Sequence, residues 1–355
     1  MDPANPHVFL DSTSPEIVYS GACTVASVDA NNTVGGSQHV CVPTSAVDIK
    51  FYGKGLEVFG ELDTSLDLKS LLDESTYTPL PSENNGTASG TKGVKLFDLG
   101  ALSNPHDVHL EPRAGQLFID YVIYTPVGKT KLDGKVLVYD DTNPALNFSG
   151  AWVARSLFAS GGNGGGEEER VRALPFNDTL MSAGSGGSSF SLGFVGSTVA
   201  VYGAFNASAG VLSASFSVDG SSPSTVTFLN RTSTSSLPEE WTLHQALFEH
   251  TFPDTDAKAE HVLNVTVVEA SEAQPFLLDY ILTTANSHTA LKERQFKKTG
   301  SEAKKTGLRI GLIILGIAGV FLAWFVWRRW RERRRKAKGG GTLEGITPVK
   351  LKRRG

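Results

Sequence analysis

Four short sequence blocks occur twice in the same order, and this internal repeat constrains the fold more than any other feature. The paired blocks are residues 10–21 and 139–150, 51–60 and 194–203, 96–98 and 247–249, and 119–123 and 278–282. The second pair shares the pattern Phe-x-Gly-x-x-aliphatic-x-Val-aromatic-Gly. Because every block returns in order, the chain is predicted to contain two copies of one domain.

Each copy alternates apolar and polar residues with period 2, as half-buried β-strands do. Clear examples are Val47, Ile49 and Phe51 in the first copy and Leu212, Ala214, Phe216 and Val218 in the second. Turn signals stand at residues 53–55, 196–197 and 219–220, where we expect hairpins. The predicted fold class is therefore all-β, with tandem β-sandwiches at 8–126 and 135–286 joined by a short linker at 127–134.

A long apolar segment follows the repeats. Residues 310–327 contain 18 consecutive residues without a charged side chain, Asn, Gln or Pro, which is nearly enough to cross a bilayer core of about 30 Å as a helix. Three tryptophans mark its C-terminal end, where indole rings favour the headgroup layer. We predict a basic stalk at 287–307, a single transmembrane helix at 308–327 and a basic tail at 328–355.

The positions of Asn-x-Ser/Thr triplets predict which side of the membrane each end of this helix faces. Seven occur, all before the apolar segment, which is more than chance predicts for this composition. The candidate glycosylation sites are Asn31, Asn85, Asn147, Asn177, Asn206, Asn230 and Asn264. We therefore expect a single-pass membrane glycoprotein, with the repeats extracellular or lumenal, the tail cytoplasmic, and the plasma membrane as its location.

Charge is distributed unevenly along the chain. Residues 1–286 carry 14 basic and 33 acidic side chains, whereas residues 287–355 carry 19 basic and 4 acidic ones. An acidic exterior argues against nucleic acid and long anionic polymers as partners. The basic tail suits the anionic lipid of an inner leaflet, so membrane lipid is the expected partner there.

The first fifteen residues have neither a basic start nor an apolar stretch, so no secretory signal is recognisable in them. We expect a signal upstream of Met1, with insertion driven by the apolar helix as the alternative.

The chain has two cysteines, Cys23 and Cys41, both in the first copy. In an oxidising compartment we expect them to form a disulfide worth about 3 kcal/mol in the chain-entropy account. A metal site is the weaker alternative, because no zinc-ligand spacing is present.

No catalytic constellation is recognisable. The Gly-x-Ser-x-Gly and His-Glu-x-x-His motifs are absent. His109 is expected to point away from the core, and Asp120 and Asp279 stand at equal positions of separate domains, so we expect them to satisfy backbone or Tyr hydroxyl groups rather than to form a glycosidase pair. The sequence thus predicts no enzyme, no cofactor and no metal. A glycine run at 161–166 lies beside three glutamates, which would repel phosphate.

The second copy contains, in order, Asp-x-Thr-x-Pro, Ser-Gly-x-Trp, Phe-x-Gly-x-x-Val-x-Val-Tyr-Gly, Val-Asp-Gly and Leu-Asp-Tyr-Ile. This order resembles the tandem galactose-binding-like jelly-roll modules of single-pass membrane proteins of mushroom-forming fungi, a family whose function is largely unassigned. The resemblance covers nearly all of residues 8–327 and implies a jelly-roll topology. The first copy departs from it, since Ala22-Cys23 replaces Ala151-Trp152 and Val-Asp-Gly is absent.

The resemblance implies a surface recognition or sensing module with cell-wall polysaccharide as ligand. Sugar rings stack on aromatic faces, so Trp241 and Trp152 are the candidate glycan-binding residues, in the second copy, although a core position is favoured for Trp152. The alternatives are a membrane-tethered enzyme of glycan metabolism and a structural or adhesion protein with protein partners.

The apolar segment also offers a face of small residues. Gly316, Gly319 and Ala323 share one side of the predicted helix, which makes it a candidate surface for homodimer formation.

Overall fold

The described part of the first repeat consists of strands and one short 3-10 helix. The structure, a computed structural model, describes residues 6–27, 33–77, 87, 89–100, 102–156, 173–206, 210–231, 241–253 and 260–291. The elements of the first repeat are β1 (His7–Asp11), β2 (Ile17–Ser20), β3 (Cys23–Ser27), η1 (Val34–Gly36), β4 (Ser37–Cys41), β5 (Ala46–Gly60), β6 (Asp67–Leu72), β7 (Ser75–Tyr77), β8 (Val94–Asp98), β9 (Ser103–Ala114), β10 (Leu117–Ile119) and β11 (Tyr121–Pro126). The predicted all-β class is therefore correct in the described part of the chain.

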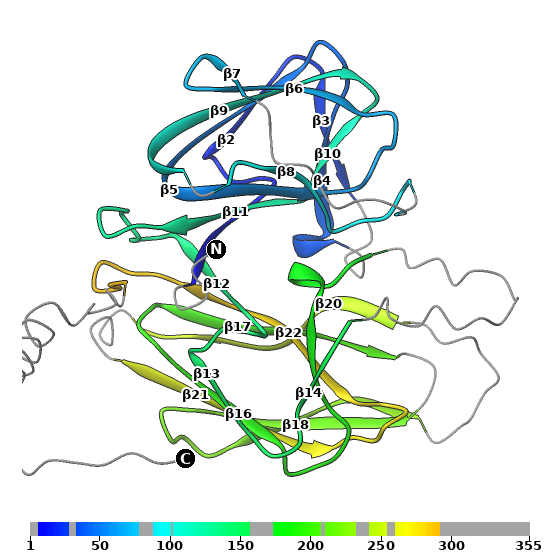
Figure 1. Cartoon of the computed structure of the whole chain (residues 1–355). Coiled ribbons are helices and arrows are strands. Elements are labelled where there is room, and N and C mark those ends of the chain that lie inside the picture. Colours follow the sequence, from blue (N-terminus) through cyan, green and yellow to red (C-terminus); the bar gives the residue numbers. More distant parts are fainter. Residues whose placement is uncertain are drawn as a thin grey trace, which may run out of the picture. The chain divides into compact units, whose positions relative to one another are not determined.

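The second repeat follows the same plan. Its elements are β12 (Val136–Asp140), β13 (Leu146–Ser149), β14 (Val153–Arg155), η2 (Phe176–Asp178), β15 (Leu180–Ala183), β16 (Ser189–Phe194), β17 (Thr198–Asn206), β18 (Gly210–Val218), β19 (Ser224–Arg231), β20 (Trp241–Thr251), β21 (His261–Glu269) and β22 (Phe276–Thr284). A five-stranded sheet in the order β13-β16-β21-β18-β19 faces the sheet that contains β17, β20 and β22 (Figure 1). The second repeat is thus a two-layer sandwich.

Strand alternation places the core where the sequence predicts it. Val47 and Ile49 are fully buried, whereas the intervening Asp48 and the following Lys50 point outward. The same alternation buries Leu212, Ala214, Phe216 and Val218 on β18. Burial of one face by apolar side chains is the main stabilising term of such sheets.

Two of the three predicted hairpins are wrong. The chain at residues 53–55 continues as the single fifteen-residue strand β5, which pairs with β2 and β9 at its start and with β11 and β8 at its end. At residues 196–197 the chain passes between layers, because β16 pairs with β13 and β21 while β17 pairs with β20 and β22. The turn at 219–220 is confirmed, since β18 and β19 are antiparallel neighbours on either side of it.

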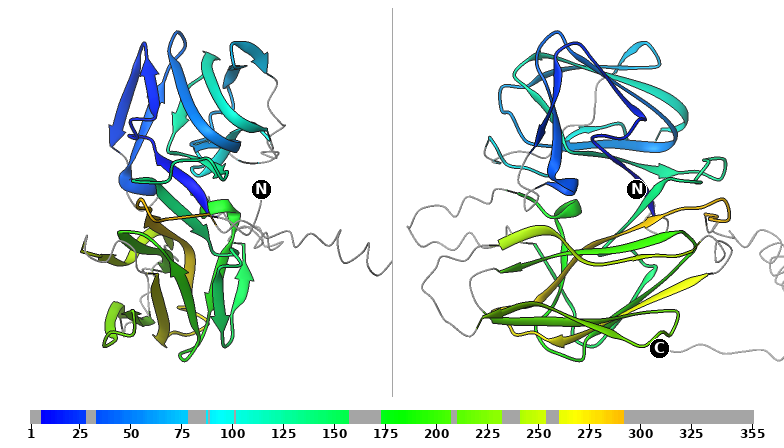
Figure 2. Two further views of the ribbon diagram at one scale, coloured as in Figure 1. Left: turned by 90° about the vertical axis from the view of Figure 1, so that its left-hand side faces the viewer. Right: turned by 180° about the vertical axis from the view of Figure 1, so that it is seen from behind.

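The two repeats join through their first strands. β1 pairs with β12 in antiparallel register, with Val8 opposite Leu137, so the large sheets of the two repeats are continuous. Beside this junction Tyr121 of the first repeat stacks on Phe176 of the second, with ring centroids 5.6 Å apart. Residues 1–292 accordingly form one compact unit (Figure 2).

The disulfide prediction is confirmed. Cys23 on β3 is bonded to Cys41 on β4, and the two residues are directly opposite each other in the three-stranded sheet β10-β4-β3. The cross-link therefore fastens an otherwise small sheet.

In the described part of the chain, none of the helical segments has the length and apolar character that crossing a bilayer requires. The predicted transmembrane helix at 308–327, its small-residue face at Gly316, Gly319 and Ala323, and the tail at 328–355 lie outside the described residues.

Candidate functional site

Trp152 is a packing residue rather than an exposed platform. Its ring contacts Phe148, Phe190 and Phe276, with centroid separations of 5.1, 5.9 and 6.2 Å. Its indole N–H donates to the carbonyl oxygens of Ser149 and Ser189, at 3.1 Å each. The side chain thus ties the start of β14 to the core, which is the alternative that the sequence favoured.

Trp241 lies elsewhere in the second repeat. It is half-buried at the start of β20, against a small cluster that includes Leu180, Leu243 and Leu277. The structure therefore does not bring the two tryptophans into a common site, and neither lines a pocket described here.

The candidate glycosylation sites differ in exposure. Asn147, Asn177, Asn230 and Asn264 are exposed, as a glycan requires. Asn206 is only 4% exposed, so a glycan there would need the side chain to turn outward. Asn31 and Asn85 lie outside the described residues.

In each repeat, the aspartate that precedes the tyrosine of the last strand accepts a hydrogen bond from a short turn. The Asp120 carboxylate accepts the backbone N–H of Val34 at 3.1 Å, and Asp279 accepts that of Phe176 at 2.9 Å. Both turns, η1 and η2, lie at the junction of the repeats. Burial raises the pKa of Asp120 to about 7 and also raises the pKa of Asp279. This confirms the structural role that the sequence predicted for them.

One cavity lies in the first repeat, against the linker and the start of the second repeat. It has a volume of about 670 Å³ and is bounded by β5, β9, β11, the turn after β6, the turn after β1 and the linker. Its lining residues are Glu16, Lys50, Phe51, Tyr52, Asp73, Pro105, His106, Asp107, Tyr124, Lys129, Thr130, Lys131 and Lys135. We call it the β5–linker pocket. Its volume falls in the range of small-ligand sites, about 300–1,000 Å³.

Aromatic rings form the base of the β5–linker pocket. Phe51 and Tyr124 are both buried, with ring centroids 5.3 Å apart, and the His106 ring lies 5.9 Å from that of Phe51. Tyr52, which follows on β5, is half-buried and also lines the pocket. The arrangement combines an apolar base with a polar rim.

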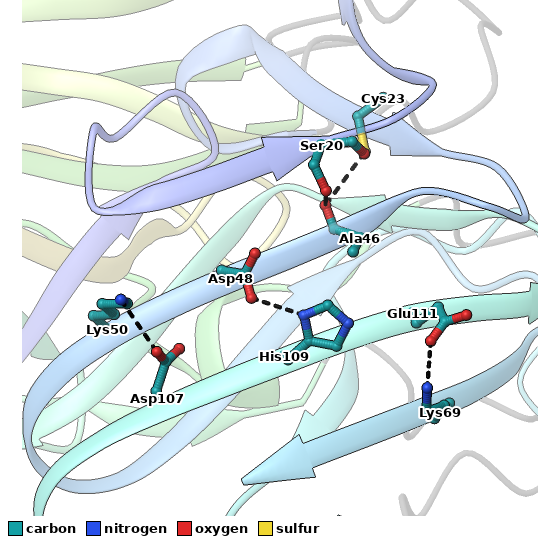
Figure 3. A network of polar contacts seen from close by, with 9 residues as sticks. All are labelled: Ser20, Cys23, Ala46, Asp48, Lys50, Lys69, Asp107, His109 and Glu111. Atoms are coloured by element: carbon teal, nitrogen blue, oxygen red, sulfur yellow. Dashed lines mark hydrogen bonds and ion pairs between the residues drawn. The ribbon is translucent and has the colours of Figure 1, made fainter. Parts of the chain in front are cut away.

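Every carboxylate that lines the pocket has a basic partner. Asp107 lies 3.2 Å from the Lys50 ammonium (Figure 3). Asp73 accepts from His106 Nδ1 at 2.8 Å, and Glu16 is hydrogen-bonded to Lys135. The backbone N–H of Asp107, followed by His106, lowers the pKa of Asp73, so this group is ionised at neutral pH.

The exposed sheet face beside the pocket carries further ion pairs. Figure 3 shows Asp48 on β5 against His109 on β9, at 2.7 Å, and Glu111 on β9 against Lys69 on β6, at 2.6 Å. His109 therefore points away from the core, as predicted. Because these groups are solvent-accessible and mutually paired, we interpret them as a paired outer surface rather than a second site.

A threonine fixes the linker at the pocket. The Thr130 hydroxyl donates to the Tyr52 carbonyl oxygen at 2.6 Å and accepts the backbone N–H of Val127 at 2.8 Å. Lys129 and Lys131 flank Thr130 and both line the cavity. The linker is thus part of the site rather than a simple spacer.

The second repeat has a pocket at the equivalent place. Thr289 donates to the Val195 carbonyl oxygen and accepts the Asn286 N–H, which reproduces the Thr130 contacts. His261 Nδ1 lies 2.8 Å from Asp219, as His106 lies from Asp73. This pocket has a volume of only about 80 Å³.

The equivalence also corrects one reading of the sequence. The Val-Asp-Gly turn of the second repeat has a counterpart in Leu72-Asp73-Glu74, because Asp73 and Asp219 make the same contacts and both have positive φ. The motif is therefore present in altered form in the first repeat.

Sequence reasoning missed this pocket because its residues are scattered among five elements and a polar linker. Aligning the repeats residue by residue would have given a signal. Glu16, Lys50, Tyr52 and Lys131 correspond to Ala145, Gly193, Val195 and Ala290, whereas Phe51, His106 and Thr130 keep their identity.

No cluster of three or more His, Cys, Asp or Glu side chains suited to a metal ion occurs among the residues that the structure describes.

No protein-family model matches the chain, and no curated protein matches it. Solved structures with some similarity include a two-domain esterase active on acetylated mannans, 18% identical, with a TM-score of 0.29, covering 46% of this chain and 40% of that one. Another is the N-terminal tandem CBM22 domain of Xyn10C from Paenibacillus barcinonensis, 13% identical, with a TM-score of 0.26, covering 79% and 98%. A cycloalternan-forming enzyme from Listeria monocytogenes is 12% identical, with a TM-score of 0.30, covering 74% and 22%. At such TM-scores these similarities carry no argument about function.

Proposed function

We propose that this chain is a glycan-recognition module and that it binds a saccharide in the β5–linker pocket. The observation that supports this proposal is the pocket itself. It has a volume of about 670 Å³, an aromatic base and a rim of lysines, a tyrosine and carboxylates. Sugars are recognised by aromatic faces that stack on the ring and by polar groups that bond the hydroxyls. Tyr52 is the proposed stacking residue.

The proposal moves the binding site from the second repeat to the first. Trp152 and Trp241 contribute to packing, and the equivalent pocket of the second repeat is about 80 Å³. In this account the second repeat is a structural partner, and its junction with β1 holds the first repeat in place.

The Asp73–His106 pair does not favour the enzyme alternative. The same pair recurs as Asp219–His261, where the imidazole is stacked on Phe252 at a centroid distance of 3.6 Å. Because the pair accompanies the fold in both repeats, we assign it a structural role and propose binding rather than catalysis.

The wider setting of this module is part of the proposal. We propose that residues 308–327 anchor it in a membrane, with the repeats outside, four exposed sequons glycosylated and the basic tail against the cytoplasmic leaflet. We further propose that the repeats are jelly rolls of the fungal membrane-protein family named above, with cell-wall polysaccharide as the ligand class.

A glycan array tests the proposal. The purified full chain, in detergent, is expected to bind one saccharide class reproducibly, and Tyr52→Val, which introduces the side chain of the second repeat, is expected to reduce that signal about tenfold because the stacking ring is lost. Trp241→Phe is the matched control, with an aromatic change outside the pocket. A blank array from folded protein would overturn glycan recognition, and loss with Trp241→Phe alone would move the site.

A further inference from the structure

We infer that the saccharide taken by the β5–linker pocket is acidic, a sugar unit bearing a carboxylate, and that Lys129 and Lys131 bind this carboxylate. This inference rests on the proposed function and specifies its ligand class.

The first observation is the pairing of polar groups within the pocket. Each of its three carboxylates is already within bonding distance of Lys50, His106 or Lys135. Over the described residues, no carboxylate lies within 4 Å of the ammonium of Lys129 or Lys131. The pocket therefore presents two cations without a protein counterion, which an anionic ligand group would supply.

The second observation is the fixed position of these lysines. Thr130 between them is bound to β5 through the Tyr52 carbonyl oxygen, and its own N–H donates to the Val127 carbonyl oxygen at 2.7 Å. The backbone from which both side chains project is therefore ordered before a ligand arrives. Ordering of this kind reduces the entropic cost of binding.

The third observation is the contrast with the second repeat. The Thr289 bonds, the Phe194 ring and the Asp219–His261 pair are all retained there. What changes is the lining, because Ala290 replaces Lys131 and Gly193 replaces Lys50. The lysines at positions 50 and 131 are therefore not needed for this turn to fold.

The surroundings limit the size of the ligand. Residues 1–286 carry 33 acidic and 14 basic side chains, so the field beyond the pocket repels a long polyanion. Screening confines attraction to the pocket to roughly 8 Å at physiological salt. A short acidic unit, such as a single uronate within or at the end of a glycan, fits this pattern better than a densely charged polymer.

Binding of matched trisaccharides to the full chain tests the inference. The probes are trisaccharides of galacturonate, glucuronate and mannuronate, their neutral hexose counterparts, and a sulfated trisaccharide, measured by calorimetry. At least one uronate probe is expected to bind tenfold or more tightly than its neutral counterpart. Lys129→Ala/Lys131→Ala is expected to remove about tenfold of that affinity, since each lysine makes a charge-assisted contact.

The control is Lys69→Ala, which removes one positive charge, against two in the double variant, from the same repeat. Lys69 is paired with Glu111 (Figure 3) and does not line the pocket. This variant is expected to leave the affinity within about twofold. Circular dichroism and the melting temperature of each variant verify folding.

The possible outcomes distinguish this inference from the proposed function on which it rests. If neutral and acidic probes bind equally and Tyr52→Val still lowers their affinity, glycan recognition is retained and the inference of an acidic ligand is overturned. Preference for the sulfated probe over every uronate would contradict the carboxylate. Binding of no saccharide by folded protein would overturn both.

Discussion

At the scale of single residues, Trp152 shows how one side chain can suggest a binding site and serve the core. Aromatic residues after a turn are good candidates for sugar stacking, but this ring is enclosed by Phe148, Phe190 and Phe276. Its N–H is shared between two carbonyl oxygens. A half-buried tryptophan whose N–H is hydrogen-bonded anchors its strand to the core.

Trp152→Ala is therefore expected to lower the free energy of unfolding by about 3 kcal/mol, because it removes a large side chain from a packed cluster. Trp152→Phe keeps one aromatic ring but loses the two N–H contacts and the volume of the second ring, and should cost less, about 2 kcal/mol. Urea denaturation provides the measurement, with the neighbouring Val153→Ala, at a position 59% exposed, as the control. A cost below about 0.5 kcal/mol for Trp152→Ala would contradict the packing role.

At the scale of elements, the two short turns η1 and η2 illustrate how a repeat reuses a polar contact. Each places its first backbone N–H on a buried aspartate of the last strand, Asp120 or Asp279. Burial disfavours the ionised form of such a carboxyl, and the pKa of Asp120 therefore rises from 3.8 to about 7. Burial and the Asp140 carboxylate likewise raise the pKa of Asp141 to about 8.

These shifts make stability depend on pH. Between the unfolded pKa of about 4 and the folded pKa of about 7, such a carboxyl binds more protons in the folded state than in the unfolded state. Its contribution to the free energy of unfolding is therefore most favourable below about pH 4 and is lost as the pH rises toward 7. The unfolding free energy of the full chain is thus expected to fall between pH 5 and pH 8. For Asp120 alone the change is at most about 4 kcal/mol.

Asp120→Asn is expected to flatten this profile and to raise stability at pH 8, since the amide oxygen can still accept the Val34 N–H without a buried charge. Urea midpoints at pH 5, 6.5 and 8 measure the effect. The exposed Asp67→Asn serves as the control and should leave the profile unchanged. A variant profile as steep as that of the unmodified chain would show that Asp120 is not the titrating group.

At the scale of the whole molecule, the continuous sheet through β1 and β12 makes one body of two repeats. Tyr121 belongs to the first repeat but contacts Phe176 of the second, and the backbone N–H of Leu174 donates to the Lys92 carbonyl oxygen across the same junction. The two copies thus share a core, while their equivalent pockets have diverged. One has a volume of about 670 Å³ and several lysines in its lining, whereas the other has a volume of about 80 Å³ and Glu260 as its charged lining residue.

Much of the fold could be predicted from the sequence, because strand periodicity and repeated blocks are local signals. They revealed the all-β class, the outward His109 and the structural role of Asp120 and Asp279. The disulfide followed from the redox setting. The crossing between layers at residues 196–197 could not be predicted, since a glycine between two strand patterns is equally consistent with a hairpin.

The pocket was beyond sequence reasoning for a related physical reason. Its lysines at 129 and 131 stand in a segment with the composition of a spacer, and the pairing of β11 with β5 together with the Thr130 contact brings that segment beside Tyr52. A contact between residues 78 positions apart produces no periodic pattern in the sequence. The tryptophans, in contrast, carried a visible signal, which pointed to the second repeat, whereas the proposed site lies in the first.

The most direct test of the central claim, that a saccharide binds in the β5–linker pocket, is lysine footprinting of the full chain. Amine acylation is measured by mass spectrometry with and without the saccharide selected on the array. Lys129 and Lys131 are expected to be protected at least threefold on binding, whereas Lys69, on the outer sheet face, should react equally in both states. Unchanged reactivity at both pocket lysines while the saccharide is bound, or protection confined to the second repeat, would contradict the account.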